Sequence, residues 1–190
     1  MLAPLLALVA CYALDDVPLQ VGGHCKPPEV HTVVRVLDGD TLQLDSCSGP
    51  EIRFLGVDAP EVVHNVADTC VANPSDSSDA RDDCYGPEAR AYLSELLTGK
   101  TVRVEYDETC TDQYGRELGY VYLVTATATD TENDAASVAS ESDLFVNLDL
   151  IRRGYARVYS DFDDIRQADV LYTAEYAAQA SSAGLWGVCE

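Results

Sequence analysis

Four short segments of this 190-residue chain carry charged side chains in patterns that packing alone does not require. The segment VLDGDTLQL places Asp38 and Asp40 at a turn. The segment RFLGVDAPE places Arg53 on a strand, with Asp58 and Glu61 beyond its end. Carboxylate oxygens are the ligands that Ca²⁺ prefers, and the planar guanidinium of arginine binds two oxygens of one phosphate. These residue types are therefore suited to phosphate chemistry beside a hard cation.

Two further segments carry an arginine and two tyrosines. TDQYGRELGYVY places Tyr114 and Arg116 at a tight turn, and CYGPEARAYL begins a helix directly after Tyr85. Taken singly, each of the four segments has an ordinary structural explanation. Asp38 with Gly39 is a strong hairpin-turn signal, and an arginine on a strand is usually a solvated side chain or half of an ion pair. Only their joint occurrence supports chemistry.

The joint pattern DGDT…R-x₄-D-x-P-E…YGPEA…TD-x-YGR resembles the thermonuclease (staphylococcal-nuclease-like) family in order and spacing. The resemblance runs from about Val30 to Trp186 and is interrupted by two acidic insertions. It implies a Ca²⁺-dependent endonuclease that hydrolyses the phosphodiester bonds of DNA and RNA. It further implies cleavage of the P–O5′ bond, which leaves 3′-phosphate ends.

The resemblance assigns catalytic roles to three residues. Arg53 and Arg116 would flank the phosphate that is cut, because two guanidinium groups suit a transition state with extra negative charge. Glu61 would orient or deprotonate the attacking water as a general base. Whether Glu61 removes the proton or only positions the water is left open by the sequence.

The resemblance also assigns a metal site and a substrate surface. Asp40 and Asp58 would bind Ca²⁺ together with the backbone carbonyl of Ala59, where an alanine is acceptable because its side chain is not a ligand. Tyr85 and Tyr114 are candidates to stack on a base or ribose, although an aromatic residue beside a glycine is often only packed. Arg152, Arg153 and Arg157 could touch substrate phosphates, but cations near a helix C-terminus need no ligand to explain them.

The elements that must position these residues are short strands and three helices. Alternating or β-rich runs predict strands over 31–46, 51–58, 101–106 and 117–124, with a hairpin turn at Asp38-Gly39. A helix is predicted between Pro87 in its first turn and Gly99 at its end, with one apolar stripe at helical spacing: Ala89, Tyr92, Leu93, Leu96 and Leu97. A short helix or a strand–helix unit is expected over 144–154, and a last helix over about 163–183. We therefore predict an α+β, β-rich fold: an OB-type five-stranded barrel packed by three helices.

The chain is expected to divide into a leader, a tether and one domain. Residues 1–11 are similar to a signal peptide with a lipobox, and 12–29 read as a tether broken by prolines and glycines. The nuclease-like domain spans 30–187, with loop insertions at about 62–84 and 125–143. No Lys or Arg precedes the apolar run, so Cys11 is either a lipidation site or an ordinary thiol.

The remaining cysteines favour disulfides over a metal cluster. No CxxC pair is present and the three histidines are scattered, which disfavours zinc. Three disulfides in an oxidising compartment are expected, so we predict an extracellular or periplasmic protein with possible lipid attachment through Cys11. A Cys70–Cys84 pair closing one polar loop is our choice among 15 pairings. The disulfide candidates are Cys25, Cys47, Cys70, Cys84, Cys110 and Cys189.

Charge is the feature that fits a nuclease least well. The chain has 12 basic and 33 acidic residues, a net charge of −21, which argues against tight, salt-driven binding of nucleic-acid backbones. It does not exclude catalysis at a site with its own arginines and a cation.

The alternatives to a nuclease are a catalytically silent nucleic-acid- or protein-binding module on the same fold, and an extracellular adhesion domain. Neither accounts for the matched charged residues. We expect a monomer, with DNA and RNA equally open as substrates.

Overall fold

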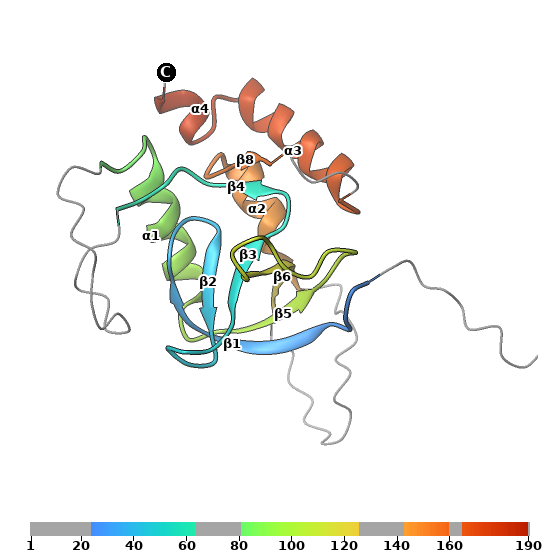
Figure 1. Cartoon of the computed structure of the whole chain (residues 1–190). Helices are drawn as coiled ribbons and strands as arrows, with labels where there is room; N and C mark the ends of the chain where they lie inside the picture. Colours follow the sequence, from blue (N-terminus) through green and yellow to red (C-terminus); the bar gives the residue numbers. More distant parts are fainter. Residues whose placement is uncertain (1–23, 64–80, 126–142, 160–164, 190) are drawn as a thin grey trace, which may run out of the picture.

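The computed structural model describes residues 24–63, 81–125, 143–159 and 165–189 (Figure 1). The strands are β1 Glu29–Val36, β2 Thr41–Leu44, β3 Glu51–Phe54, β4 Val57–Asp58, β5 Thr101–Glu105, β6 Glu117–Leu123, β7 Leu144–Phe145 and β8 Arg157–Val158. The helices are α1 Gly86–Leu97, α2 Val146–Arg153, α3 Ala168–Ala180 and α4 Leu185–Val188. None of the helices in these ranges is long and apolar enough to cross a membrane.

Five strands close into the predicted barrel. Their order is β3-β2-β1-β5-β6, and a parallel pairing of β3 with β6 returns the sheet to its start. The long strand β1 pairs with β5 through its first half and with β2 through its second half. Its register shifts between Val33 and Arg35. Such an irregularity bends a strand and increases its twist, so β1 turns the corner that closure requires.

The helices pack beside the barrel, with α1 against β1 and with α3 and α4 at the top of the view in Figure 1. On α1 the residues Ala89, Leu93 and Leu97 are fully buried, which confirms the predicted apolar stripe of that helix. α2 packs against both α3 and β6. Its Asn147 is completely buried; it accepts from the N–H of Val121 (2.9 Å) and donates to the carbonyl of Leu55 (2.9 Å). This side chain therefore joins α2 to the end of β3 and to β6.

Two predicted elements are divided in the structure. The strand predicted over 51–58 breaks at Leu55-Gly56, and its last part, β4, pairs with β8 outside the barrel. The helix predicted to about residue 183 ends at Ala180, because Ser182 and Gly184 both have φ of 53° and redirect the chain into α4. Both breaks matter for the site, since β4 carries Asp58 and α4 brings the chain terminus back beside the start of α1 (Figure 1).

The last residues of the predicted tether contact the barrel. Cys25 forms a disulfide with Cys110. Lys26 forms ion pairs with Glu29 (2.9 Å) and Glu117 (2.8 Å). The last residues of the predicted tether are thus held against the barrel, whereas 1–23 and the greater part of the two predicted insertions lie outside the described residues.

The predicted Cys70–Cys84 pair is wrong, because Cys84 is bonded to Cys189. Cys84 precedes α1 and Cys189 follows α4, so the disulfide joins segments 105 residues apart. Cys47 is also disulfide-bonded. Cys11 and Cys70 lie outside the described residues, so the lipidation of Cys11 stays a prediction.

Candidate active site

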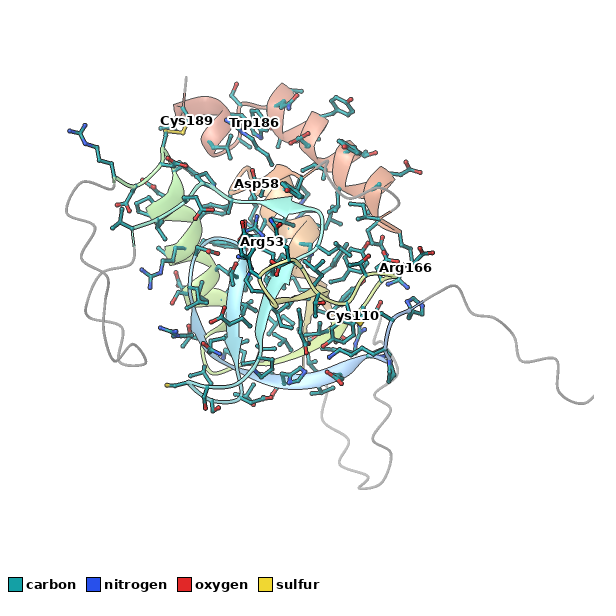
Figure 2. All side chains as sticks on the ribbon, in the orientation of Figure 1. Arg53, Asp58, Cys110, Arg166, Trp186 and Cys189 are labelled. Atoms are coloured by element: carbon teal, nitrogen blue, oxygen red, sulfur yellow. A yellow bond between two sulfur atoms is a disulfide. The ribbon has the colours of Figure 1, made fainter. Side chains whose placement is uncertain are left out.

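Arg53 binds two of the predicted site carboxylates at once. Thr41 is the register partner of Arg53 in the β2–β3 pairing, which places Asp40 at the same end of the barrel. One arm of the guanidinium, Nη1, forms an ion pair with Oδ1 of Asp40, and Nη2 donates to Oδ1 of Asp58 at 3.1 Å. Figure 2 labels Arg53 and Asp58 in the region between the barrel strands and the C-terminal helices.

Asp40 is held rigidly in the interior. It is 1% exposed. Its Oδ2 accepts from the N–H of Ala59 (2.7 Å), and its own N–H donates to Oδ1 of Asp38 (3.0 Å). A buried carboxylate is stable only when its oxygens have partners, and Oδ1 of Asp40 accepts from the hydroxyl of Thr41 (3.1 Å) and pairs with Arg53. The hairpin-turn role predicted for Asp38 is thereby confirmed.

Glu61 borders a cavity of about 300 Å³ that also reaches Asp58. Partial withdrawal from water raises the pKa of Glu61 above its ordinary value, and the nearby carboxylates of Asp38, Asp58 and Asp83 raise it further, against the opposing effect of Arg53. A carboxyl group with a raised pKa is a better proton acceptor than an ordinary glutamate. The lining residues are Asp58, Ala59, Pro60, Glu61, Asp83, Cys84, Arg157 and Cys189.

The segment 82–86, directly before and at the start of α1, fixes the backbone of Glu61. The N–H of Asp83 donates to the carbonyl of Glu61 (2.9 Å), and Oδ2 of Asp83 accepts from the N–H of Glu61 (3.4 Å). A Cβ on Gly86 would lie 2.6 Å from the same carbonyl, so no other residue fits there without a shift. The Cys84–Cys189 disulfide anchors this segment to the end of the chain. Sequence reasoning assigned CYGPEA only to a helix start and missed this contact.

Arg116 directly precedes the strand that pairs with the strand of Arg53. In the parallel pairing of β3 and β6, Arg53 is level with Leu118, so Arg116 lies just before the neighbouring strand. Its Nε donates to Oδ2 of Asp112 (2.7 Å), while Oδ1 of Asp112 accepts from the N–H groups of Tyr114 (2.9 Å) and Arg116 (3.0 Å). Asp112 therefore forms the turn and also orients the arginine side chain.

The two candidate tyrosines differ in their surroundings. Tyr114 is 77% exposed, with the guanidinium of Arg116 5.5 Å from its ring centre. Tyr85 has a left-handed backbone (φ 73°) at the start of α1, and its ring stacks on Tyr155 at 5.7 Å. Tyr114 is thus free to meet a ligand with most of its surface, whereas Tyr85 is already engaged in packing. Stacking on a substrate stays a prediction for both.

The carboxylates around Arg53 are of the chemical type that binds a hard cation. Asp40 and Asp58 both contact the guanidinium of Arg53, so their oxygens converge on one region, and Glu61 and Asp83 add carboxylates at the neighbouring cavity. Within the described ranges, no group of three or more His, Cys, Asp or Glu side chains is arranged to hold a metal ion. Ala59 contacts Asp40 through its N–H. The ligand role of its carbonyl stays a prediction.

Comparison with known proteins gives a consistent result. The family model described as "Staphylococcal nuclease homologue" matches residues 51–188. The chain is 27% identical to the thermonuclease of Staphylococcus intermedius over 96% of this chain and 90% of that protein. It is 32% identical to an uncharacterized endonuclease of Escherichia coli, over 81% of this chain and 74% of that protein. It is 31% identical to endonuclease YhcR of Bacillus subtilis over 81% of this chain, a match that spans only 11% of the Bacillus protein.

Proposed function

The chain belongs to the staphylococcal nuclease homologue family, and from that premise we propose that it is a Ca²⁺-dependent endonuclease acting on DNA and RNA. It is a hydrolytic nuclease on the OB-type barrel of this family. The observation that carries the proposal is the arrangement of Arg53 between Asp40 and Asp58 beside the cavity of Glu61. These residues occupy the family pattern in this sequence.

Arg53 and Arg116 are proposed to bind the phosphate that is cut. Each arginine is held by a carboxylate, Arg53 by Asp40 and Asp58 and Arg116 by Asp112. Pre-orientation of this kind lets a guanidinium stabilise developing negative charge without reorganisation during the reaction. Because Arg53 lies on β3 and Arg116 directly precedes the neighbouring strand β6, the two are proposed to bind one phosphate between them.

Glu61 is proposed to accept the proton of the attacking water. Its raised pKa favours proton acceptance, and the segment 82–86 keeps its backbone in place. Attack of the water oxygen on phosphorus breaks the P–O5′ bond, so the electron pair and a proton leave with the 5′ oxygen. The products are a 3′-phosphate and a 5′-hydroxyl.

Asp40, Asp58 and the carbonyl of Ala59 are proposed to hold Ca²⁺. The local excess of carboxylates over guanidinium groups favours a cation, and hard oxygen donors favour Ca²⁺ over softer metals. When bound, the ion supplies positive charge that attracts a phosphate oxygen and makes a bound water more acidic.

The disulfides support an extracellular or periplasmic location. Cys25–Cys110 and Cys84–Cys189 both join distant segments, and such bonds persist in oxidising compartments. Attachment through a lipid on Cys11, and a monomeric state, belong to the same proposal. Labelling of the cell-envelope fraction with a lipid precursor, with Cys11→Ser as control, tests the anchor; an unlabelled wild-type protein would contradict it.

A plasmid and an RNA transcript serve to test the activity. Purified protein should nick both with millimolar Ca²⁺ and stop when a chelator is added. The cleaved DNA strands should carry a 3′-phosphate, so a polymerase should not extend them as primers. Treatment with a 3′-phosphatase should remove the phosphate and permit extension. Intact nucleic acid at micromolar protein and millimolar Ca²⁺ would contradict the proposal, and cleavage unaffected by chelator would contradict its metal.

A further inference from the structure

Arg157 is a cation of the Glu61 cavity that the proposed reaction does not use. It lies on β8, where its register partner on β4 is Asp58. In an antiparallel pair, the side chains of register partners lie on the same face. Among the residues that the structure describes, Arg157 forms no ion pair with a carboxylate, and the Asp58 oxygen Oδ1 is engaged by Arg53.

The side chain of Arg157 contacts Trp186 instead. The guanidinium of Arg157 lies 5.1 Å from the centre of the Trp186 ring, within the range of a cation–π contact. Trp186 stands at the start of α4, and the disulfide of Cys189 fixes the end of that short helix (Figure 2). The arginine side chain is thus oriented by an aromatic ring, which leaves its N–H groups available to an anion.

An unpaired cation at this position is unusual in so acidic a protein. Most of the basic residues within the described ranges have a carboxylate partner or another polar contact. The basic residues with no carboxylate partner and no other polar side-chain contact among the described residues are Arg81, Lys100 and Arg157. Of these three, only Arg157 lines the cavity that Glu61 borders. With a net charge of −21, the chain offers nucleic acid few attractive contacts, so a cation at this place has a large relative effect.

We propose that Arg157, supported by Trp186, binds a substrate phosphate next to the one held by Arg53 and Arg116. This inference rests on the proposed function. It assigns Arg157 to substrate binding along the chain of phosphates, not to the bond that is broken. The site therefore requires a substrate with at least two phosphates for full affinity.

The test compares wild type, Arg157→Gln and Lys100→Gln on two single-stranded substrates. One is a dinucleotide with a single phosphodiester, and the other is an octanucleotide. Arg157→Gln should raise KM for the octanucleotide about tenfold with kcat within about twofold, which is the scale of one lost hydrogen bond to a charged group. The salt slope of log kcat/KM should fall by about 0.7, as for one phosphate contact on a single strand. Cleavage of the dinucleotide should be unchanged.

Lys100→Gln removes the same charge from a residue that does not line the cavity, so its KM and salt slope should match wild type. Unchanged KM and salt slope in Arg157→Gln, or an equal loss on the dinucleotide, would overturn the inference while the nuclease itself stands. A wild-type protein that cleaves neither substrate would instead overturn the proposed function. Trp186→Leu should reproduce part of the KM effect, with folding checked by circular dichroism.

Discussion

Removal of the Cys84–Cys189 disulfide should lower the free energy of unfolding by an amount that follows from the length of the loop it closes. The bond closes a loop of 105 residues. The chain-entropy relation for such a loop gives a loss of about 16 cal/mol/K, or about 4.8 kcal/mol of unfolding free energy at 25 °C. With a urea dependence of about 2 kcal/mol/M, Cys84→Ser/Cys189→Ser should lower the unfolding midpoint by about 2 M.

Cys25–Cys110 provides a matched control. Its separation is 85 residues, for which the same relation gives about 4.6 kcal/mol. The two double variants should therefore lose nearly the same stability. A loss below about 1 kcal/mol in either variant would refute the loop-entropy reasoning for that bond.

The two variants should differ in activity. Cys84 is adjacent to Asp83, which binds the backbone of Glu61, and both cysteines of this bond line the cavity. Under conditions where each variant is fully folded, Cys84→Ser/Cys189→Ser should lose about tenfold in kcat, because a small displacement of a catalytic group lowers the rate strongly. The Cys25→Ser/Cys110→Ser variant should keep kcat within about threefold. Equal kcat in both variants would refute a role of the Cys84–Cys189 bond in holding Glu61.

Three further changes test the supporting contacts. Asp83→Ala should lower kcat about tenfold at unchanged KM. Asp83→Asn should keep most of the wild-type kcat, because an amide oxygen can still accept from the Glu61 N–H. An equally low kcat in Asp83→Asn would argue against this contact. Arg116→Ala should lower kcat at least about 10²-fold with folding intact, the scale of one transition-state donor, and a near-normal rate would remove Arg116 from the mechanism. Partial burial raises the pKa of Asp112, but hydrogen bonds from Arg116 and from backbone N–H groups outweigh it and hold the pKa below its ordinary value. Asp112→Asn should therefore cost about 1–2 kcal/mol of unfolding free energy at pH 6, a difference that shrinks as the pH falls through the lowered pKa; a difference independent of pH would contradict this.

Much of the fold follows from local patterns. The hairpin at Asp38-Gly39 and the stripe of Ala89, Leu93 and Leu97 are encoded by turn chemistry and by helical spacing, both of which act over a few residues. The joint pattern also singled out Asp40 and Arg53 as site residues, although it did not predict that they contact each other, as they do in the structure.

The missed features depend on contacts between distant segments. Cys84 could not be matched to Cys189 because the return of the chain through α4 has no local signature. The break of the predicted strand at Gly56 depends on the pairing of β4 with β8, a strand in the C-terminal part of the chain. The contact of Arg157 with Trp186 arises from the same two segments, so its availability to an anion could not be read from spacing.

The central claim is that the guanidinium fork of Arg53, held by Asp40 and Asp58, acts on a phosphodiester. The most direct measurement is the single-turnover rate of plasmid cleavage in Ca²⁺ by wild type, Arg53→Lys and, as control, Arg152→Lys at an exposed position. Lysine keeps the charge beside buried Asp40 but cannot bind two oxygens in a fork. We expect Arg53→Lys to remain folded and to be at least about 10²-fold slower, with Arg152→Lys unchanged. An Arg53→Lys rate within about threefold of wild type would contradict the account.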